Sequence, residues 1–181
     1  FSQYDNDKDD YVDFVYIIYA GKGEADGGAE NTIWPHAWDV YSAEYFDNCS
    51  YNESKRMFDG KYIYQYACSG ELDGPTGKRA GIGTIAHEFS HVIGMLDLYD
   101  IDYGQNYENE STPGIWHIMD AGSYNNNGLT PPVYSAYDRY YMGWITPSIM
   151  NSAENVSLQD LQTTNTARVV TANGTLPSAT S

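Results

Sequence analysis

Basic residues are scarce in this chain. The 181 residues include 9 Lys and Arg against 25 Asp and Glu, for a formal net charge of -16. A nucleic-acid ligand is therefore not expected, because a phosphate backbone is bound by a basic surface. An anionic membrane surface would repel the protein for the same reason. The acidity instead suits solubility outside the cell or sites for hard cations such as calcium.

Long apolar runs are also absent. The longest, Phe14 to Ala20, has the length of a strand and is far too short to cross a bilayer, so we expect no membrane insertion. The chain shows no signal peptide and begins at Phe1 rather than at a methionine. We therefore interpret it as a processed or excised piece of a longer precursor.

Cysteine is sparse, with only Cys49 and Cys68. If the two residues pair, they close a short loop and indicate an oxidising compartment. If they do not pair, the expectation is two buried free thiols. The sequence alone leaves both alternatives open.

The apolar pattern of the first half predicts two strands and a helix. Val12 to Ala20 is rich in Val, Ile, Tyr and Phe and predicts a buried strand, and Lys61 to Cys68 alternates as a second strand does. Residues 24–60 are predicted to be irregular. Apolar residues at helical spacing predict a helix over Arg79 to Ile93, which Gly94 ends.

The second half of the chain is more polar. Residues 98–130 are predicted to form a loop region, and Ala136 to Gly143 a second helix entered through Pro131-Pro132. From Asn151 onward the chain is rich in Ser, Thr and Asn, which is typical of a linker or of the first strand of a neighbouring domain. We therefore predict a domain over residues 1–150, followed by a separate segment over 151–181.

The helix predicted over residues 79–93 carries His87-Glu88-Phe89-Ser90-His91. Residues four apart lie on one helix face, so both imidazoles can reach one metal ion. Glu88 lies beside them, where a carboxylate can take a proton from metal-bound water. The pattern predicts a zinc site that performs hydrolysis.

Asp97 is the candidate for a third zinc ligand. Gly94 lets the chain leave the helix sharply, because glycine tolerates a positive φ. Asp97 then lies where the chain can turn back to the metal, and three protein ligands leave the fourth zinc position for water. Two alternatives remain open: Asp97 caps a turn, or it binds calcium together with Asp100 and Asp102.

The pattern His87-Glu88-x-x-His91-x-x-Gly94-x-x-Asp97 resembles the metzincin consensus, with Asp in place of the usual third His. The flanking segments resemble the M6 family, the immune inhibitor A type of secreted bacterial metallopeptidase. The resemblance covers roughly residues 5–146. Besides the zinc motif it rests on Asp9-Asp10-Tyr11-Val12-Asp13, Ile33-Trp34-Pro35-His36-Ala37-Trp38, Asp97-Leu98-Tyr99-Asp100, Trp116-His117-Ile118-Met119-Asp120 and Gly143-Trp144.

The resemblance implies an α+β, metzincin-like zinc peptidase domain with a twisted sheet, an active-site helix and a loop-rich C-terminal part. It also implies a secreted or extracytoplasmic bacterial enzyme that acts on protein or peptide substrates. Metzincins begin with a strand and a helix ahead of the strand predicted at residues 12–20, and those elements are mostly missing here. We therefore expect residues 1–150 to be a catalytic domain without its N-terminal elements. Residues 151–181 would be a linker or the start of a following β domain, and the oligomeric state is not indicated.

The resemblance also implies roles for residues outside the zinc motif. Met119 is similar to the methionine of the metzincin Met-turn, whose thioether forms an apolar floor beneath the metal without binding it. Tyr124 would donate a hydrogen bond to the oxyanion, with Tyr137 and Tyr140 as rivals for that role. Gly122-Ser123-Tyr124 is expected near the specificity pocket.

Other residues receive weaker expectations. His36 lies between two tryptophans and is expected to be packed or hydrogen-bonded, and His117 is expected to be structural. Gly70-Glu71-Leu72 is expected near the rim of the cleft.

An acidic loop near the start of the chain resembles the first part of a calcium site. Oxygen donors fall at alternate positions, which are Asp5, Asp7, Asp9 and then Asp13. Asp10 occupies the turn position usually given to Gly, and Tyr16 the position that should offer a bidentate Glu. The alternative is a solvated acidic turn ahead of a strand.

We interpret the chain as a zinc-dependent endopeptidase in which Glu88 activates zinc-bound water. One alternative is a gluzincin-type peptidase with a Glu as third ligand, for which Glu108 and Glu110 are the candidates. The other is a non-catalytic binding module stabilised by calcium or zinc.

Overall fold

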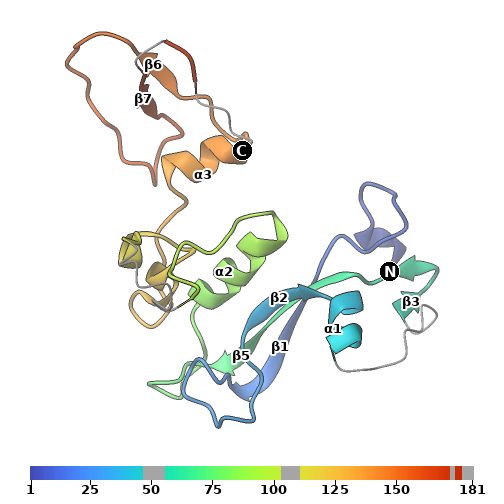
Figure 1. The fold of residues 1–181 in the computed structure, drawn as a ribbon. Helices are drawn as coiled ribbons and strands as arrows, with labels where there is room; N and C mark the ends of the chain where they lie inside the picture. Colours follow the sequence, from blue (N-terminus) through green and yellow to red (C-terminus); the bar gives the residue numbers. More distant parts are fainter. Residues whose placement is uncertain (47–55, 103–110, 172–173, 177–181) are drawn as a thin grey trace. The chain divides into compact units, whose positions relative to one another are not determined.

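The computed structural model describes residues 1–46, 56–102, 111–171 and 174–176. Within these ranges the protein has a mixed α/β architecture with few helices and small sheets (Figure 1). The chain divides into two compact units, Phe1–Pro131 and Pro132–Ser181. The zinc motif belongs to the first unit.

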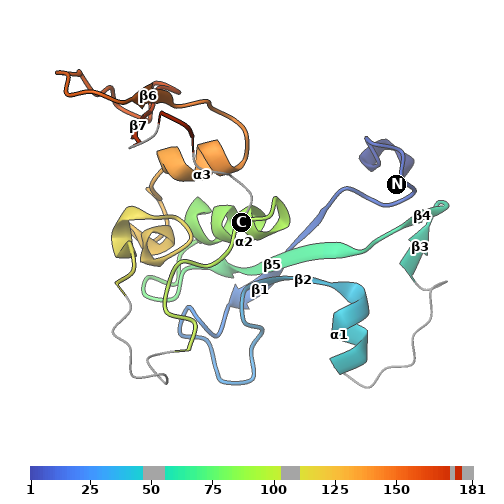
Figure 2. The ribbon, with the colours of Figure 1, turned by 45° about the horizontal axis from the view of Figure 1, so that its top comes forward.

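The first unit is built on a three-stranded sheet with the order β1-β5-β2 (Figures 1 and 2). β1 (Val15–Lys22) runs parallel to β5 (Gln65–Leu72), and β2 (His36–Asp39) runs antiparallel to β5 along its other side. The central strand is the best buried, because Ala67 is covered on one face of the sheet and Cys68 on the other. The core of the sheet therefore lies along β5.

Both predicted strands are present but displaced. The strand expected at residues 12–20 is found as β1, where Val, Tyr and Ile favour extended backbone. The strand expected over Lys61–Cys68 is divided. Its start is β4 (Lys61–Tyr62), which pairs with β3 (Met57–Phe58), and its end is the first half of β5.

The expectation that residues 24–60 are irregular is wrong for part of that span, which contains β2, α1 (Val40–Phe46) and β3. The four residues of β2 show no apolar alternation, so their extended state comes from pairing with β5. α1 follows directly, and Asp39 Oδ1 caps it by accepting from the Ser42 N–H at 2.8 Å.

The helix predicted over residues 79–93 is confirmed as α2 (Ile82–Val92), which packs against β5. It ends as expected at Gly94, whose φ is +97°. Near its start, Gly83 approaches the loop of residues 121–128 so closely that a Cβ would overlap the carbonyl oxygen of Ser123. Because Gly83 is four residues from His87, this loop lies beside the helix face that carries the histidines.

The region 98–130 is rich in loops, as predicted. Its described part contains two short 3-10 helices, η3 (Gly114–Trp116) and η4 (Ala121–Tyr124). The buried Asp120 connects them, because its two carboxylate oxygens accept from the N–H groups of Gly114 and Ala121, both at 2.6 Å. This carboxylate fixes the loop that leads to Tyr124.

The second unit contains α3 (Ala136–Tyr141) and a parallel pair of short strands, β6 (Ser148–Met150) and β7 (Arg168–Val170). α3 confirms the helix predicted from Ala136 and begins with a capping box between Ser135 and Asp138. The compact units divide at Pro131 and Pro132, whereas the functional boundary near residue 150 stays a prediction. Among the described helices, none combines the length and the apolar character that a bilayer span requires.

Candidate metal centre

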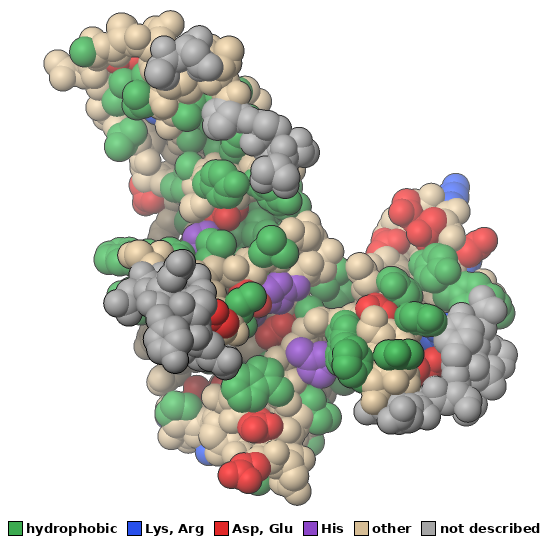
Figure 3. Space-filling model, in the orientation of Figure 1, with side chains coloured by type: hydrophobic (Ala, Val, Ile, Leu, Met, Phe, Trp, Pro, Cys, Tyr) green, Lys and Arg blue, Asp and Glu red, His purple; other side chains and the backbone are tan. Residues whose placement is uncertain are grey.

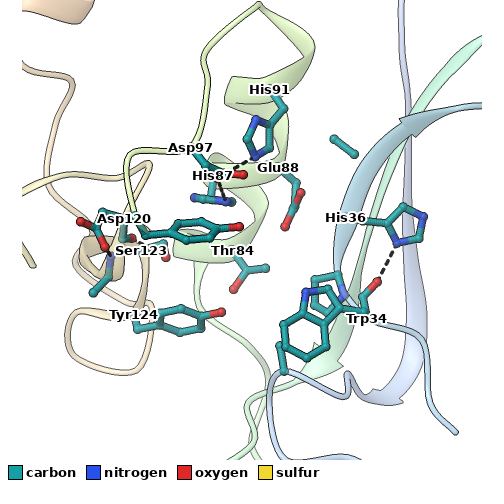
Figure 4. Close-up of a pocket in the computed structure, with 15 residues that line it drawn as sticks. Trp34, His36, Thr84, His87, Glu88, His91, Asp97, Asp120, Ser123 and Tyr124 are labelled. Atoms are coloured by element: carbon teal, nitrogen blue, oxygen red, sulfur yellow. Dashed lines mark hydrogen bonds and ion pairs between the residues drawn. The ribbon is translucent and has the colours of Figure 1, made fainter. Parts of the chain in front are cut away.

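His87 and His91 lie one turn apart on α2, with ring centroids 5.0 Å apart (Figure 4). Nδ1 of His87 donates to the carbonyl of Ile118 at 2.8 Å, and Nδ1 of His91 to the carbonyl of Met95 at 2.9 Å. A carbonyl can only accept, so Nδ1 of each ring carries the proton and Nε2 of the neutral ring keeps its lone pair. Both Nε2 atoms are thereby oriented as metal-ligating atoms.

Asp97 approaches the two rings from the segment that follows Gly94. Its Oδ1 lies 3.3 Å from Nε2 of His87 and 3.2 Å from Nε2 of His91. The same oxygen is buried and accepts no hydrogen bond from a described residue. Burial raises the pKa of Asp97, but protons carried on Nε2 of the two rings, at the place where a metal ion would supply the positive charge, hold that pKa well below its ordinary value. Three lone-pair donors thus converge on one point.

These separations fit a tetrahedral zinc ion. Bonds of about 2.0–2.1 Å from zinc to nitrogen and oxygen place neighbouring ligand atoms about 3.3 Å apart in a tetrahedron. Oδ1 of Asp97 lies at that spacing from both nitrogen atoms. Two imidazoles and one carboxylate also leave one position open, as catalytic zinc sites do.

Glu88 adds a second carboxylate to the cluster. Its side chain is buried, with 6% exposed, and one of its oxygens lies within 4.8 Å of a ring nitrogen of each histidine. Burial raises the pKa of Glu88, although the nearby imidazoles oppose that shift. Asp97 pairs with both rings at short distance, which makes it the better candidate for a third ligand and leaves Glu88 as the candidate for proton transfer.

A tight turn lies beside the cluster, because its Ile118 carbonyl accepts from Nδ1 of His87. The N–H of Asp120 donates to the carbonyl of His117 at 3.2 Å, which places Met119, 1% exposed, within the turn. The carbonyl of Met119 accepts from the N–H of Leu98 at 2.9 Å, so the turn is tied to the segment that carries Asp97. Nδ1 of His117 accepts from the Met119 N–H at 3.1 Å, as expected for a structural histidine.

A pocket of about 630 Å³ opens over the cluster. α2 contributes Thr84 to its lining, the segment 34–37 forms another wall, and Tyr124 comes from η4. Figure 3 shows histidine and acidic side chains grouped in a hollow of the surface. The polar groups of the site are therefore open to a ligand.

The three tyrosine candidates for an oxyanion donor lie in different units of the chain. Tyr124 lines the pocket, and Figure 4 shows its hydroxyl directed into it. Tyr137 and Tyr140 lie on α3, in the second unit, so their roles as rivals stay predictions. Glu108 and Glu110, the candidates for a glutamate ligand, lie outside the described residues.

Two further expectations concern the surroundings of the cluster. Asp100 Oδ1 accepts from the N–H of Asp102 at 3.1 Å, whereas Asp97 is directed to the histidines. Gly70-Glu71-Leu72 forms the end of β5, where Oε1 of Glu71 accepts from the Gly21 N–H at 3.1 Å. This stretch is not part of the pocket lining.

His36 is hydrogen-bonded, as predicted. Its Nδ1 donates to the carbonyl of Trp34 at 2.7 Å and its Nε2 lies 3.0 Å from the hydroxyl of Tyr66. Hydrogen bonding to the Cys68 thiol, assisted by the Trp34 carbonyl, raises the pKa of His36 to about 9. Cys68 is a free, buried thiol, and Cys49 lies outside the described residues.

The acidic loop follows η1 (Ser2–Tyr4). Three of its four predicted calcium ligands each place one oxygen within 4.8 Å of the others, and these are Asp5, Asp7 and Asp13. Oδ1 of the fourth, Asp9, accepts from a backbone N–H two residues further on. Asp10 has a φ of +74°, which is the conformation that a glycine would supply at this position.

The ammonium group of a lysine from β4 lies among the carboxylates of the acidic loop. Nζ of Lys61 is 2.7 Å from Oδ2 of Asp5 and 2.7 Å from Oδ1 of Asp10. The hydrogen bond from Lys61 lowers the pKa of Asp5, and burial opposes that shift. The loop therefore has an internal cation, and calcium binding stays a prediction.

Comparison with known protein families identifies the family of the chain that carries this site. A profile described as the catalytic domain of immune inhibitor A peptidase M6 matches residues 3–145. The chain belongs to the M6 peptidase family. An M6 domain is the catalytic domain of a metallopeptidase, and peptidases act on protein or peptide substrates.

Two named proteins are similar to this chain, and one of them is named a metalloprotease. The chain is 28% identical over 153 residues to Immune inhibitor A of Bacillus thuringiensis subsp. alesti, which covers 78% of the chain and 21% of that protein. It is 25% identical over 159 residues to Pre-pro-metalloprotease PrtV of Vibrio cholerae serotype O1 (strain M66-2). This alignment covers 85% of the chain and 16% of the Vibrio protein. The chain thus spans about a fifth or less of the length of these relatives.

Several parts of the M6 site were missed by the sequence analysis. The carbonyls of Ile118 and Met95 orient the two imidazoles, and no residue type marks such a role because every residue has a carbonyl. Thr84 lies three residues before His87 on α2, so helical spacing would have placed it on the same face. Trp34 was noted for family resemblance and not as a wall of the pocket.

Proposed function

We propose that this M6 domain is a zinc-dependent endopeptidase that hydrolyses peptide bonds with a water activated by Glu88. The observation that carries the proposal is the buried Oδ1 of Asp97, which accepts no hydrogen bond from a described residue and faces Nε2 of both histidines. An ionised oxygen opposite two lone pairs is unfavourable unless a cation lies among them. The nitrogen and oxygen donors and their spacing favour zinc.

His87, His91 and Asp97 would hold the zinc ion. When bound, zinc supplies a Lewis acid that lowers the pKa of a coordinated water to about 7 and polarises a carbonyl. The contribution of the chain is orientation, through the carbonyls of Ile118 and Met95 that fix the two rings. Loss of such supporting partners typically weakens metal affinity or activity by about 10–100-fold.

Glu88 is the general base and then the general acid of this mechanism. Its carboxylate takes a proton from the attacking water as the oxygen of that water bonds to the peptide carbonyl carbon. It then gives the proton to the amide nitrogen as the C–N bond breaks. Burial supports this role because it raises the pKa of Glu88 and so increases its affinity for the proton that it must carry.

Tyr124 is proposed to stabilise the charge that develops on the substrate carbonyl oxygen. Its hydroxyl is directed into the pocket that holds the metal cluster. A hydroxyl placed there can donate a hydrogen bond to the oxygen on which negative charge develops.

The substrate is proposed to lie alongside β2. This strand is at the edge of the described sheet, paired with β5 on its other side, and residues 34–37 border the pocket. An extended peptide can add a strand to such an edge, with main-chain hydrogen bonds for affinity and alternate side chains directed into the pocket. Such binding suits an endopeptidase, because it needs no free chain terminus.

The proposal extends to the architecture and setting of the domain. The fold is metzincin-like, with Met119 as the apolar floor. Residues 1–150 form the catalytic domain and 151–181 a linker or the start of a following β domain. Secretion is supported by the word pre-pro in the name of the Vibrio relative. Calcium at Asp5, Asp7, Asp9 and Asp13 is proposed only as a competitor of Lys61, whose ammonium lies 2.7 Å from Oδ2 of Asp5.

Replacing Glu88 tests the proposed chemistry. Glu88→Gln keeps the shape of the side chain but removes the base, so zinc content should stay near one ion per chain. Cleavage of a fluorescent casein should fall by about 10²–10⁴-fold. Elemental analysis and the cleavage assay measure the two effects. The exposed Glu30→Gln is the matched control and should behave as the wild type. Full activity in Glu88→Gln would reject the mechanism.

The alternatives give different results. In a gluzincin-type site, Glu108→Gln or Glu110→Gln would release zinc and Asp97→Asn would not. A non-catalytic module would bind zinc without cleaving casein in any metal state. Removal of zinc by a chelator and its restoration should abolish and restore cleavage in the enzyme that we propose.

A further inference from the structure

The zinc pocket has aromatic residues in its lining that remain exposed to solvent. Trp34 and Tyr124 are each 54% exposed, and both belong to the lining. Figure 4 shows the indole and the phenol ring on opposite sides of the pocket, with Thr84 between them and the metal cluster beyond. Exposed apolar surface that is concentrated in a cleft marks a place where a ligand buries its own apolar groups.

The backbone that carries Trp34 is fixed without substrate. The carbonyl of Ile33 accepts from the hydroxyl of Tyr19 at 2.6 Å, and the carbonyl of Trp34 accepts from Nδ1 of His36 at 2.7 Å. Pro35 follows and restricts the backbone of Trp34 to extended conformations. A ligand that binds the indole therefore has little backbone ordering to offset, which favours affinity.

The charges of the pocket argue against a basic side chain as the occupant of this space. The lining contains three carboxylates, which are Glu88, Asp97 and Asp120. The first two belong to the metal cluster, and both oxygens of Asp120 accept backbone N–H groups. Among the described residues of this lining, no carboxylate is therefore left over to pair with a lysine or arginine of the substrate, and two others, Asp26 and Asp73, line an adjoining pocket that Tyr124 also borders.

We propose that Trp34 is a specificity-determining residue of this cleft and selects substrates with an aromatic or large apolar side chain next to the scissile bond. The inference rests on the proposed peptidase function and names the substrate class of the same site. The substrate side chain lies between the indole of Trp34 and the ring of Tyr124. Contact with an aromatic face and loss of water together favour such a side chain over alanine by roughly ten- to a hundredfold.

Matched quenched peptides that differ at one position test the inference. Phe, Leu, Ala or Lys is placed in turn on each side of the cleaved bond. The wild type should prefer Phe and Leu over Ala and Lys in kcat/KM. In Trp34→Ala, the ratio of kcat/KM for the Phe peptide to that for the Ala peptide should fall by at least about tenfold, mainly through KM. A preference for Lys, or an unchanged ratio in Trp34→Ala, overturns the inference.

Trp116→Ala is the matched control. Its side chain is 81% exposed and is not part of the pocket lining, so the same substitution there should leave the Phe-to-Ala ratio unchanged. An equal fall in both variants would show a general effect of losing an indole and would also overturn the inference.

A binding measurement separates this inference from the proposed function. Glu88→Gln protein is titrated with the same peptides by calorimetry, with and without the added Trp34→Ala change. Tighter binding of the Phe peptide that depends on Trp34 supports the inference even if the wild type cleaves no peptide. Equal binding of the Phe and Ala peptides overturns it even if the wild type cleaves both.

Discussion

Two clusters of potential metal ligands in the first unit differ in how their atoms are satisfied. At the cluster on α2, both Nδ1 atoms are held by carbonyls, while Oδ1 of Asp97 has no hydrogen bond from a described residue. At the acidic loop, Oδ2 of Asp5 is paired with Lys61 and its Oδ1 accepts from the N–H of Asp9 at 3.1 Å. The side chain of Asp5 and the Oδ1 atom of Asp97 are both buried, but only Asp97 leaves its buried oxygen without a hydrogen-bond donor among the described residues.

The difference teaches that convergence alone does not define a metal site. Each cluster brings three side chains within 4.8 Å of one another. Convergence indicates a metal when the other atoms of the ligands are fixed and the converging atoms lack a proton donor. The cluster on α2 meets both conditions, whereas the acidic loop has a lysine within it. We therefore expect opposite changes in metal binding. The cluster on α2 should lose its metal when Asp97 is neutralised, whereas the acidic loop should gain a metal when Lys61 is neutralised.

Loss of Asp97 should have the largest effect. Asp97→Asn removes the negative charge that balances the positive charge of the metal ion. Zinc content should therefore fall to a small fraction of one ion per chain, and casein cleavage should fall by at least about 100-fold. Elemental analysis and the cleavage assay measure this. Asp100→Asn, three residues further on, should retain both zinc and activity. Equal loss in both variants would favour the alternative in which Asp97 and Asp100 act together in one cation site.

Removal of Lys61 should have an intermediate effect and tests the acidic loop. Lys61→Met leaves the buried Asp5 without its partner, so the thermal midpoint should fall by a few degrees in calcium-free buffer. Millimolar calcium should restore it, because the three carboxylates then face no internal cation. Lys8→Met makes the same charge change within the loop and should alter the midpoint little. If calcium raises the thermal midpoint of the wild type by as much as it raises that of the Lys61→Met variant, Lys61 does not compete with the ion.

The smallest expected effect is a pH dependence of stability at the acidic loop. The pKa of Asp5 lies below its ordinary value of 3.8, so its ionised form stabilises the fold above that pH. The stabilisation should be lost as the pH falls through 3.8 toward the lowered value. Urea midpoints between about pH 2 and 6 should show a shallower acid decline in Asp5→Asn than in the wild type. Parallel declines would contradict the assignment.

The sequence predicted α2 and its histidines because apolar residues and metal ligands both recur at helical spacing, although the structure leaves Ile82 59% exposed and buries Gly83, Glu88 and Ser90 instead. Ile82, Ile85 and Val92 give the helical period, and His87 and His91 follow it. Gly94 was predicted as the end of the helix because few other residues favour a positive φ there. Local pattern was therefore sufficient for the part of the site that one element carries.

The parts that depend on distant segments could not be predicted. β2 is extended because β5 pairs with it, and its four residues carry no pattern of their own. Lys61 reaches Asp10 across 51 positions of sequence, which no spacing rule anticipates. The carbonyls that orient the rings have no signature in residue type. Long-range pairing and backbone roles thus account for most of what the sequence analysis missed.

The contact at Gly83 has a consequence for protein engineering. The absence of a side chain at this position sets how near the Tyr124 loop can come to the ligand-bearing helix. Any larger residue would push the loop away from α2 and so move Tyr124, the proposed oxyanion donor, out of its position in the pocket. Libraries that aim to change substrate preference should therefore vary the rim at position 34 and keep residue 83 as glycine.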